Sequence, residues 1–178
     1  MDNYLKSVKK LFLYYKKIGE EAMQQLSEEE LFWQYNEESN SIAIIVRHIA
    51  GNMLSRFTDF LISDGEKPWR NRDEEFRNGF KSKEELFTKW EEGWSCLFNA
   101  VDTLTENDLS AVIFIRNEKH TVTEALNRQL AHYPYHVGQI IFIAKMAKNA
   151  DWKTLSIARN KSADFNNKMF ASNEENKI

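Results

Sequence analysis

The chain has 178 residues, of which 42% are hydrophobic and 13% aromatic, enough apolar surface for the core of a single domain. Its 24 basic and 27 acidic side chains give a formal net charge of −3, which disfavours nucleic acid and anionic membranes as partners. The single cysteine, Cys96, excludes an internal disulfide and is typical of a reducing compartment. We see neither a signal peptide nor an apolar run of about 18 residues, so we expect a cytoplasmic protein without a membrane span.

Three amphipathic helices are predicted in the first two thirds of the chain. Apolar residues at helical spacing predict the first over residues 5–26. The apolar stretch 40–65 is too long for a strand and predicts the second, with Asp64 and Gly65 as its stop. The third covers residues 82–104 and begins at a capping box. The segment 66–81 between them has mixed charge and no helical period, and we expect an ordered connecting loop.

The last third predicts a hairpin, a fourth long helix and a polar tail. Residues 112–122 alternate around a polar turn, as in a small β-hairpin, and residues 122–148 have one apolar helical face. Four long helices with one long connection predict an all-α fold, a four-helix bundle. We expect the bundle domain to cover residues 1–165 and a polar, frayed tail to cover residues 166–178.

The histidines are the residues most indicative of chemistry. His132 and His136 lie four residues apart in the predicted fourth helix, so both imidazoles project from the same face. His48 lies on the second helix, also on a largely inward face. A bundle interior can gather such side chains into a metal site, and three imidazoles leave one coordination position open. The alternative is three unrelated histidines, each hydrogen-bonded or half exposed. His120 falls in the polar hairpin, where we expect it to be exposed.

Other polar residues are candidates for supporting such a site. Metal-bound histidines usually donate their second ring N–H to an acceptor. The nearest candidates are the amides about one turn from the three histidines, Asn52, Gln129 and Gln139. The alternative is that they are ordinary helix amides. Three loop cations near the bundle mouth are candidates for holding an anionic substrate: Arg70, Arg72 and Arg159. The alternative is that they are solvated loop charges.

The helix around His48 and the later run H-x-x-x-H-x-G-Q-I, residues 132–140, resemble the DinB-like superfamily (damage-inducible, YfiT-like proteins of bacteria). The stretches NSIAIIVRHIAGNMLSRFTDFLISDGEKPWRNRDEEF, KWEEGWSCLF and NRQLAHYPYHVGQIIFIAK resemble one of its subfamilies of uncharacterised function more closely. The likeness extends from about residue 1 to residue 166. It implies a four-helix bundle, often a homodimer, that binds a divalent metal ion through His48, His132 and His136. Ni and Zn are the metals we expect.

The resemblance also implies a class of function. Characterised superfamily members are not DNA-binding proteins, and several are transferases or isomerases that act with low-molecular-weight thiols such as bacillithiol or mycothiol. We therefore predict a metal-dependent transferase of a small molecule, with such a thiol or a metal-activated water as nucleophile. The alternative is a non-catalytic dimeric bundle with a structural metal or none. Pro134 departs from the superfamily pattern, as do Ala158 and Asn160, which stand where proline and glycine are expected.

Overall fold

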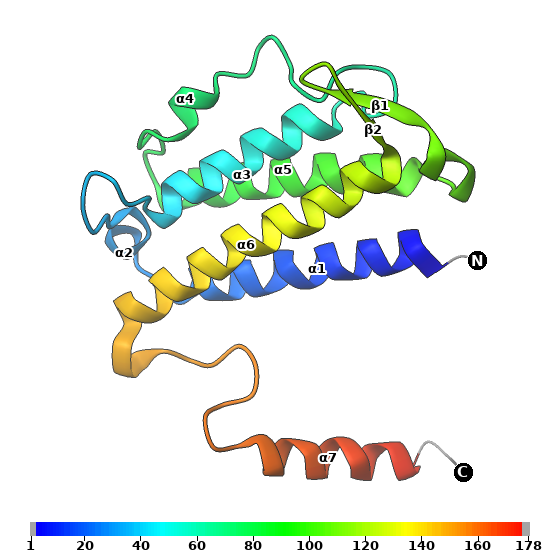
Figure 1. Ribbon diagram of the computed structural model, residues 1–178. Helices are drawn as coiled ribbons and strands as arrows, with labels where there is room; N and C mark the ends of the chain where they lie inside the picture. Colours follow the sequence, from blue (N-terminus) through cyan, green and yellow to red (C-terminus); the bar gives the residue numbers. More distant parts are fainter. Residues whose placement is uncertain (1–2, 176–178) are drawn as a thin grey trace.

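The computed structural model describes residues 3–175, and helices make up most of them (Figure 1). In chain order they are α1 (Asn3–Gln24), α2 (Glu28–Phe32), α3 (Ile42–Phe57), α4 (Arg72–Glu75), α5 (Lys83–Thr103), α6 (Val122–Lys148) and α7 (Ser162–Glu175), with 3-10 turns η1 (Glu106–Ser110) and η2 (Asn149–Asp151). Strands β1 (Val112–Ile115) and β2 (Glu118–Thr121) pair antiparallel as the expected hairpin. The predicted all-α class is confirmed.

Side-chain caps explain where the long helices begin. Ser41, Ser82 and Thr121 each accept a hydrogen bond from the backbone N–H three residues later, so α3, α5 and α6 start with a satisfied donor. Thr121 and Glu124 complete a reciprocal capping box at α6. The helix then continues through Pro134, which has no N–H to donate to the preceding turn. The histidines at positions 132 and 136 therefore share one helix.

The long helices pack side by side around one apolar core. Helix α3 lies along α5, α1 lies along α6, and α3 also contacts α6 (Figure 1). Phe12, Trp94 and Tyr133, from three different helices, are fully buried between them. Gly93 lets α5 approach α3 closely, since a Cβ there would lie only 2.8 Å from the Ala50 Cα. This packing places α3 beside α6, the two helices that carry the histidines.

Helix α3 ends at Phe57, earlier than the sequence predicts. The stretch up to residue 65 is apolar, but Asp59 adopts a left-handed backbone with φ of 50°. Aspartate tolerates that conformation better than most residues, and one left-handed residue suffices to end a helix. The backbone N–H groups of Ile62 and Ser63 then bond to the Asp59 carbonyl in a tight turn. The chain is thereby turned into the connection that covers α3.

The C-terminal part of the described chain differs from the frayed tail that we expected. It forms α7, whose side chains are exposed from Ser162 to Ala171 and which lies apart from the other helices (Figure 1). Within residues 3–175, no helix combines the length and the apolar character needed to cross a membrane.

Candidate metal centre

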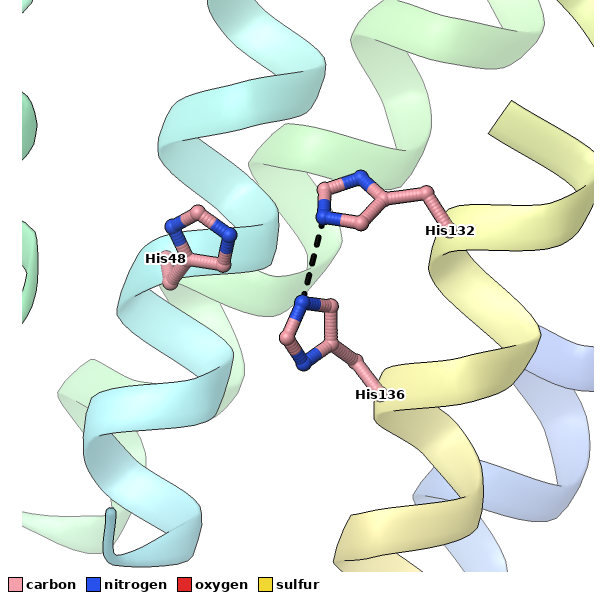
Figure 2. A group of neighbouring side chains, drawn as sticks. All are labelled: His48, His132 and His136. Carbon is pink, nitrogen blue, oxygen red and sulfur yellow. Dashed lines mark hydrogen bonds between the residues drawn. The ribbon is translucent and has the colours of Figure 1, made fainter. Parts of the chain in front are cut away.

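Three histidines from two helices converge between α3 and α6 (Figure 2). The Nε2 atoms of His132 and His136 lie 3.1 Å apart, as expected for imidazoles one turn apart on a helix. The ring centre of His48 lies 5.5 Å from that of His132 and 5.0 Å from that of His136. One nitrogen from each ring falls within 4.8 Å of the other two. The structure thus brings together the three residues that the sequence singled out.

Each of the three rings is oriented by a hydrogen bond at Nδ1. The Nδ1 of His48 lies 3.0 Å from Glu75 Oε2, and that of His136 lies 2.8 Å from Gln139 Oε1. A longer contact of 3.4 Å joins His132 Nδ1 to Gln129 Oε1. The Glu75 and Gln139 oxygens only accept, so His48 and His136 donate through Nδ1–H and present a lone pair at Nε2. This is the outer hydrogen-bonding pattern of metal-bound histidines.

The donor set fits a divalent ion. The Nε2 atoms of His132 and His136 lie 3.1 Å apart, a hydrogen-bonding distance at which both atoms can also reach one ion. Two nitrogens on a tetrahedral ion with bonds of 2.0–2.1 Å lie about 3.3 Å apart, close to this spacing. Burial, with further contributions from His136 and His48, lowers the pKa of His132 to about 3. His132 is therefore neutral at pH 7 and ready to bind a cation.

Glu75 contacts the histidine cluster but was not among the residues predicted from the sequence. It lies on α4 in the connecting segment, is buried, and forms a bidentate ion pair with Arg70 at 2.7 and 2.8 Å. Burial alone would raise the pKa of Glu75, but the contacts with His48 and Arg70 outweigh it and hold the pKa below its usual value. Glu75 is thus ionised and able to fix the His48 ring. In a run of loop charges, nothing marks this glutamate as the buried one.

The family of the chain follows from a sequence comparison. Residues 1–161 match the family described as "Protein of unknown function (DUF1572)". The chain belongs to the DUF1572 family. This family is DinB-like, which confirms the superfamily resemblance at that level. A search of curated proteins finds no match.

Only some of the other predicted site residues of this DUF1572 protein lie near the histidines. Arg70 and Arg72 line a cavity beside His48 and His132, whereas Arg159 is exposed in the segment between η2 and α7 and does not line it. Asn52 also lines the cavity, but its Oδ1 accepts a hydrogen bond from the Tyr133 hydroxyl at 3.0 Å and does not orient a histidine.

The fourth histidine stands apart from the cluster. His120 lies on β2, opposite Ile113 in the hairpin. We expected it to be exposed, yet only 18% of its side chain is accessible. The hairpin packs against the long helices rather than projecting into solvent, because Ile113 and Ile115 on β1 belong to the hydrophobic core. His120 is absent from the group of metal-competent side chains found in the described chain.

Cys96 shows no sign of being a nucleophile of the DUF1572 site. It is half-buried on α5, where its sulfur lies 3.6 Å from the Thr58 hydroxyl. Burial raises the pKa of its thiol above the ordinary value, and the Thr58 contact offsets this only in part. A reactive cysteine needs the opposite shift.

Proposed function

We propose that this protein binds one divalent metal ion through Nε2 of His48, His132 and His136, and that it catalyses a metal-dependent group transfer on a small molecule. The observation that carries the proposal is that all three rings are held at Nδ1 while one nitrogen of each gathers at a common point. Imidazole donors suit Zn and Ni. We further propose that α1, α3, α5 and α6 form the four-helix bundle of the DinB-like superfamily, and that two copies associate as a homodimer.

The chain's own residues would prepare the site for chemistry. When bound, the ion supplies a Lewis acid that lowers the pKa of a water or a thiol at its open position. Glu75 keeps the proton of His48 on Nδ1, and Gln139 does the same for His136. Phe76 packs against the His48 ring, with centroids 4.8 Å apart.

Two observations favour a catalytic centre over a structural one. In the part of the chain that the structure describes, the cluster holds three side-chain donors and no fourth. Structural zinc sites are closed by four protein ligands, whereas catalytic sites keep a position free. In addition, a cavity adjoins His48 and His132. Because Cys96 is unsuited to nucleophilic attack, an external low-molecular-weight thiol or water fits this site best.

Metal content tests the first half of the proposal. Purified protein incubated with Zn or Ni and desalted is expected to carry about one ion per chain in elemental analysis, under a single three-histidine site. His48→Ala, His132→Ala and His136→Ala are each expected to lose the ion. His120→Ala, which removes the histidine outside the cluster, is expected to retain it. Folded wild-type protein that stays metal-free would refute the proposal.

Cobalt substitution tests whether a coordination position is open. The visible spectrum of a cobalt-loaded protein reports the ligands of the ion. Adding a small thiol is expected to shift that spectrum, because the thiol can enter the free position. A spectrum unchanged at millimolar thiol would contradict a metal-bound thiol as the nucleophile and leave metal-bound water.

A further inference from the structure

A small cavity next to the histidines is lined by an unusual concentration of arginines. Its volume is about 230 Å³, and it adjoins His48 and His132. The arginines come from four segments distant in sequence and are Arg56 on α3, Arg70 just before α4, Arg72 on α4, Arg116 in the hairpin turn and Arg128 on α6. Guanidinium groups repel one another, so their convergence in one small space needs negative charge to balance it.

The carboxylates nearby balance only part of this charge. Glu66 Oε2 is shared by Arg56 at 3.0 Å, Arg116 at 3.1 Å and Arg70 at 3.4 Å. Glu75 pairs with Arg70 and is also engaged by His48. Two carboxylates therefore serve three of the five arginines. The cavity keeps a net positive charge.

The remaining polar groups at the cavity are unused donors. Arg72 and Arg128 form no ion pair with any residue between positions 3 and 175, and Arg72 rests on the Phe76 ring. Arg56 is only 6% exposed, and its Nε atom is buried without a hydrogen-bond partner. A buried donor without an acceptor costs about 1–3 kcal/mol, and Arg56 is one of the residues that line the cavity.

The side-chain amides that line the cavity also present hydrogen-bond donors, as the arginines do. Asn52 uses its carbonyl oxygen to accept from Tyr133, and Gln129 uses its own for the contact with His132. Both side chains are therefore left with NH2 groups as donors at the cavity. A lining of guanidinium and amide donors recognises an oxyanion, and planar guanidinium groups bind carboxylate and phosphate in the same forked geometry.

We propose that this arginine cavity binds a carboxylate or phosphate group carried by the substrate. Its role as a substrate subsite rests on the proposed function, but the anion site itself requires no metal. The volume suits one small acidic group rather than a whole drug-sized ligand, for which pockets begin at about 300 Å³. The bound group lies beside His132 and so directs the rest of the substrate toward the three-histidine cluster.

Anion binding to metal-free protein tests this inference independently of activity. After chelation, we would titrate inorganic phosphate and succinate separately by calorimetry at low ionic strength. At least one is expected to bind at a single site. Binding of phosphate alone identifies a phosphoryl group, and binding of succinate alone identifies a carboxylate. A Kd of about 1 mM would be weak binding. If neither anion binds at concentrations up to about 20 mM, the inference is wrong.

Variants locate the site. Arg128→Gln removes an exposed, unpaired arginine from α6 and is expected to raise the Kd at least fivefold, as is Arg72→Gln. Lys145→Gln removes a cation of the same helix far from the cavity and is expected to leave the Kd unchanged. Equal losses in all three variants would mean a non-specific field and would overturn the proposal.

Metal titration of the same proteins separates the two proposals. Arg128→Gln is expected to bind metal at least as tightly as the wild type does, because Arg128 is not among the three ligands and its positive charge opposes a cation at His132. Anion binding without metal binding would refute the proposed function and leave the anion site standing. Metal binding without anion binding would refute this inference alone.

Discussion

Gly51 gives Glu75 the room to reach His48. Gly51 lies on α3 three residues after His48, and a Cβ at this position would lie 2.8 Å from the Glu75 carboxyl carbon and closer still to Oε1. No side chain, however small, fits there while the carboxylate keeps its place. The absence of a side chain at one helical position is thus part of the structure that orients a histidine.

Gly51→Ala is expected to weaken metal binding while preserving the helix. In an ordinary helix this change stabilises by about 0.5–1 kcal/mol, but here the methyl group must push Glu75 away from His48. Loss of such a supporting partner typically costs 10–100-fold in metal affinity. Competition with a chromogenic chelator measures the effect. Gly138→Ala on α6 is the matched control, because its Cβ would meet nothing within 4 Å, and it should keep wild-type affinity.

Glu75→Gln is expected to weaken metal binding by a similar factor without changing the packing volume. The amide is neutral, so it holds the His48 proton less strongly and leaves Arg70 without its closest anion. Breaking a buried ion pair costs about 3–5 kcal/mol, so urea unfolding should also show a clear loss of stability. Glu74→Gln, on the same short helix but in a surface pair with Arg77, is expected to change neither property. Equal metal affinity in both variants would argue against the role of Glu75.

Adding and removing metal is expected to shift the thermal stability of the protein. A ligand that binds only the folded state stabilises it by about 2.7 kcal/mol at 100 times its Kd. The melting temperature should therefore rise with Zn or Ni and return to its starting value with excess chelator. His132→Ala should show no rise. A rise of equal size in that variant would place the stabilising ion elsewhere.

Asp64 is expected to contribute acid-sensitive stability. Its carboxylate accepts the backbone N–H groups of Glu66 at 2.7 Å and of Arg116 and Asn117 at 2.8 Å, which joins the loop after α3 to the hairpin turn. Burial alone would raise the pKa of Asp64, but these three donors outweigh it and lower the pKa below 3.8. A lowered pKa gives stability that is complete well above pH 3.8 and is lost as the pH falls through the folded-state value.

Asp64→Asn weakens three hydrogen bonds to a carboxylate and is expected to cost about 1 kcal/mol of unfolding free energy at pH 7. The difference from wild type should shrink below pH 3.8. Chemical unfolding at pH 7, 5 and 3 measures it. Asp59→Asn is the control, since asparagine accepts the left-handed backbone at that position. A constant difference at all three pH values would show that the charge of Asp64 is irrelevant.

Cys96 is expected to react slowly in the folded protein. Burial raises the pKa of its thiol, so little thiolate is present at pH 7. Alkylation by iodoacetamide should be slower than that of a free thiol and should accelerate in urea. Cys96→Ala should bind metal as the wild type does. If it instead loses thiol-dependent activity of the metal-loaded protein, the assignment of the nucleophile to an external thiol is wrong.

The sequence predicts the helices and the histidines well because both leave periodic signals. Apolar spacing and the caps at Ser82 and Thr121 mark α5 and α6, and an interval of four places His132 and His136 on one face. The end of α3 was predicted too late because the turn at Asp59 depends on backbone geometry within an apolar stretch. Glu75 escaped prediction because burial of a loop charge depends on tertiary packing, here on Gly51 and Arg70.

The separation of His48 from the other two histidines along the chain has a consequence for folding. Single helices form within about a microsecond, but bringing α3 against α6 requires closure of a long intervening stretch, which is slower. During refolding, circular dichroism should recover before the capacity to take up metal does. An expanded, helix-rich state would give a native-like circular dichroism signal without having the site. Metal uptake therefore reports native tertiary structure more faithfully than helix content does.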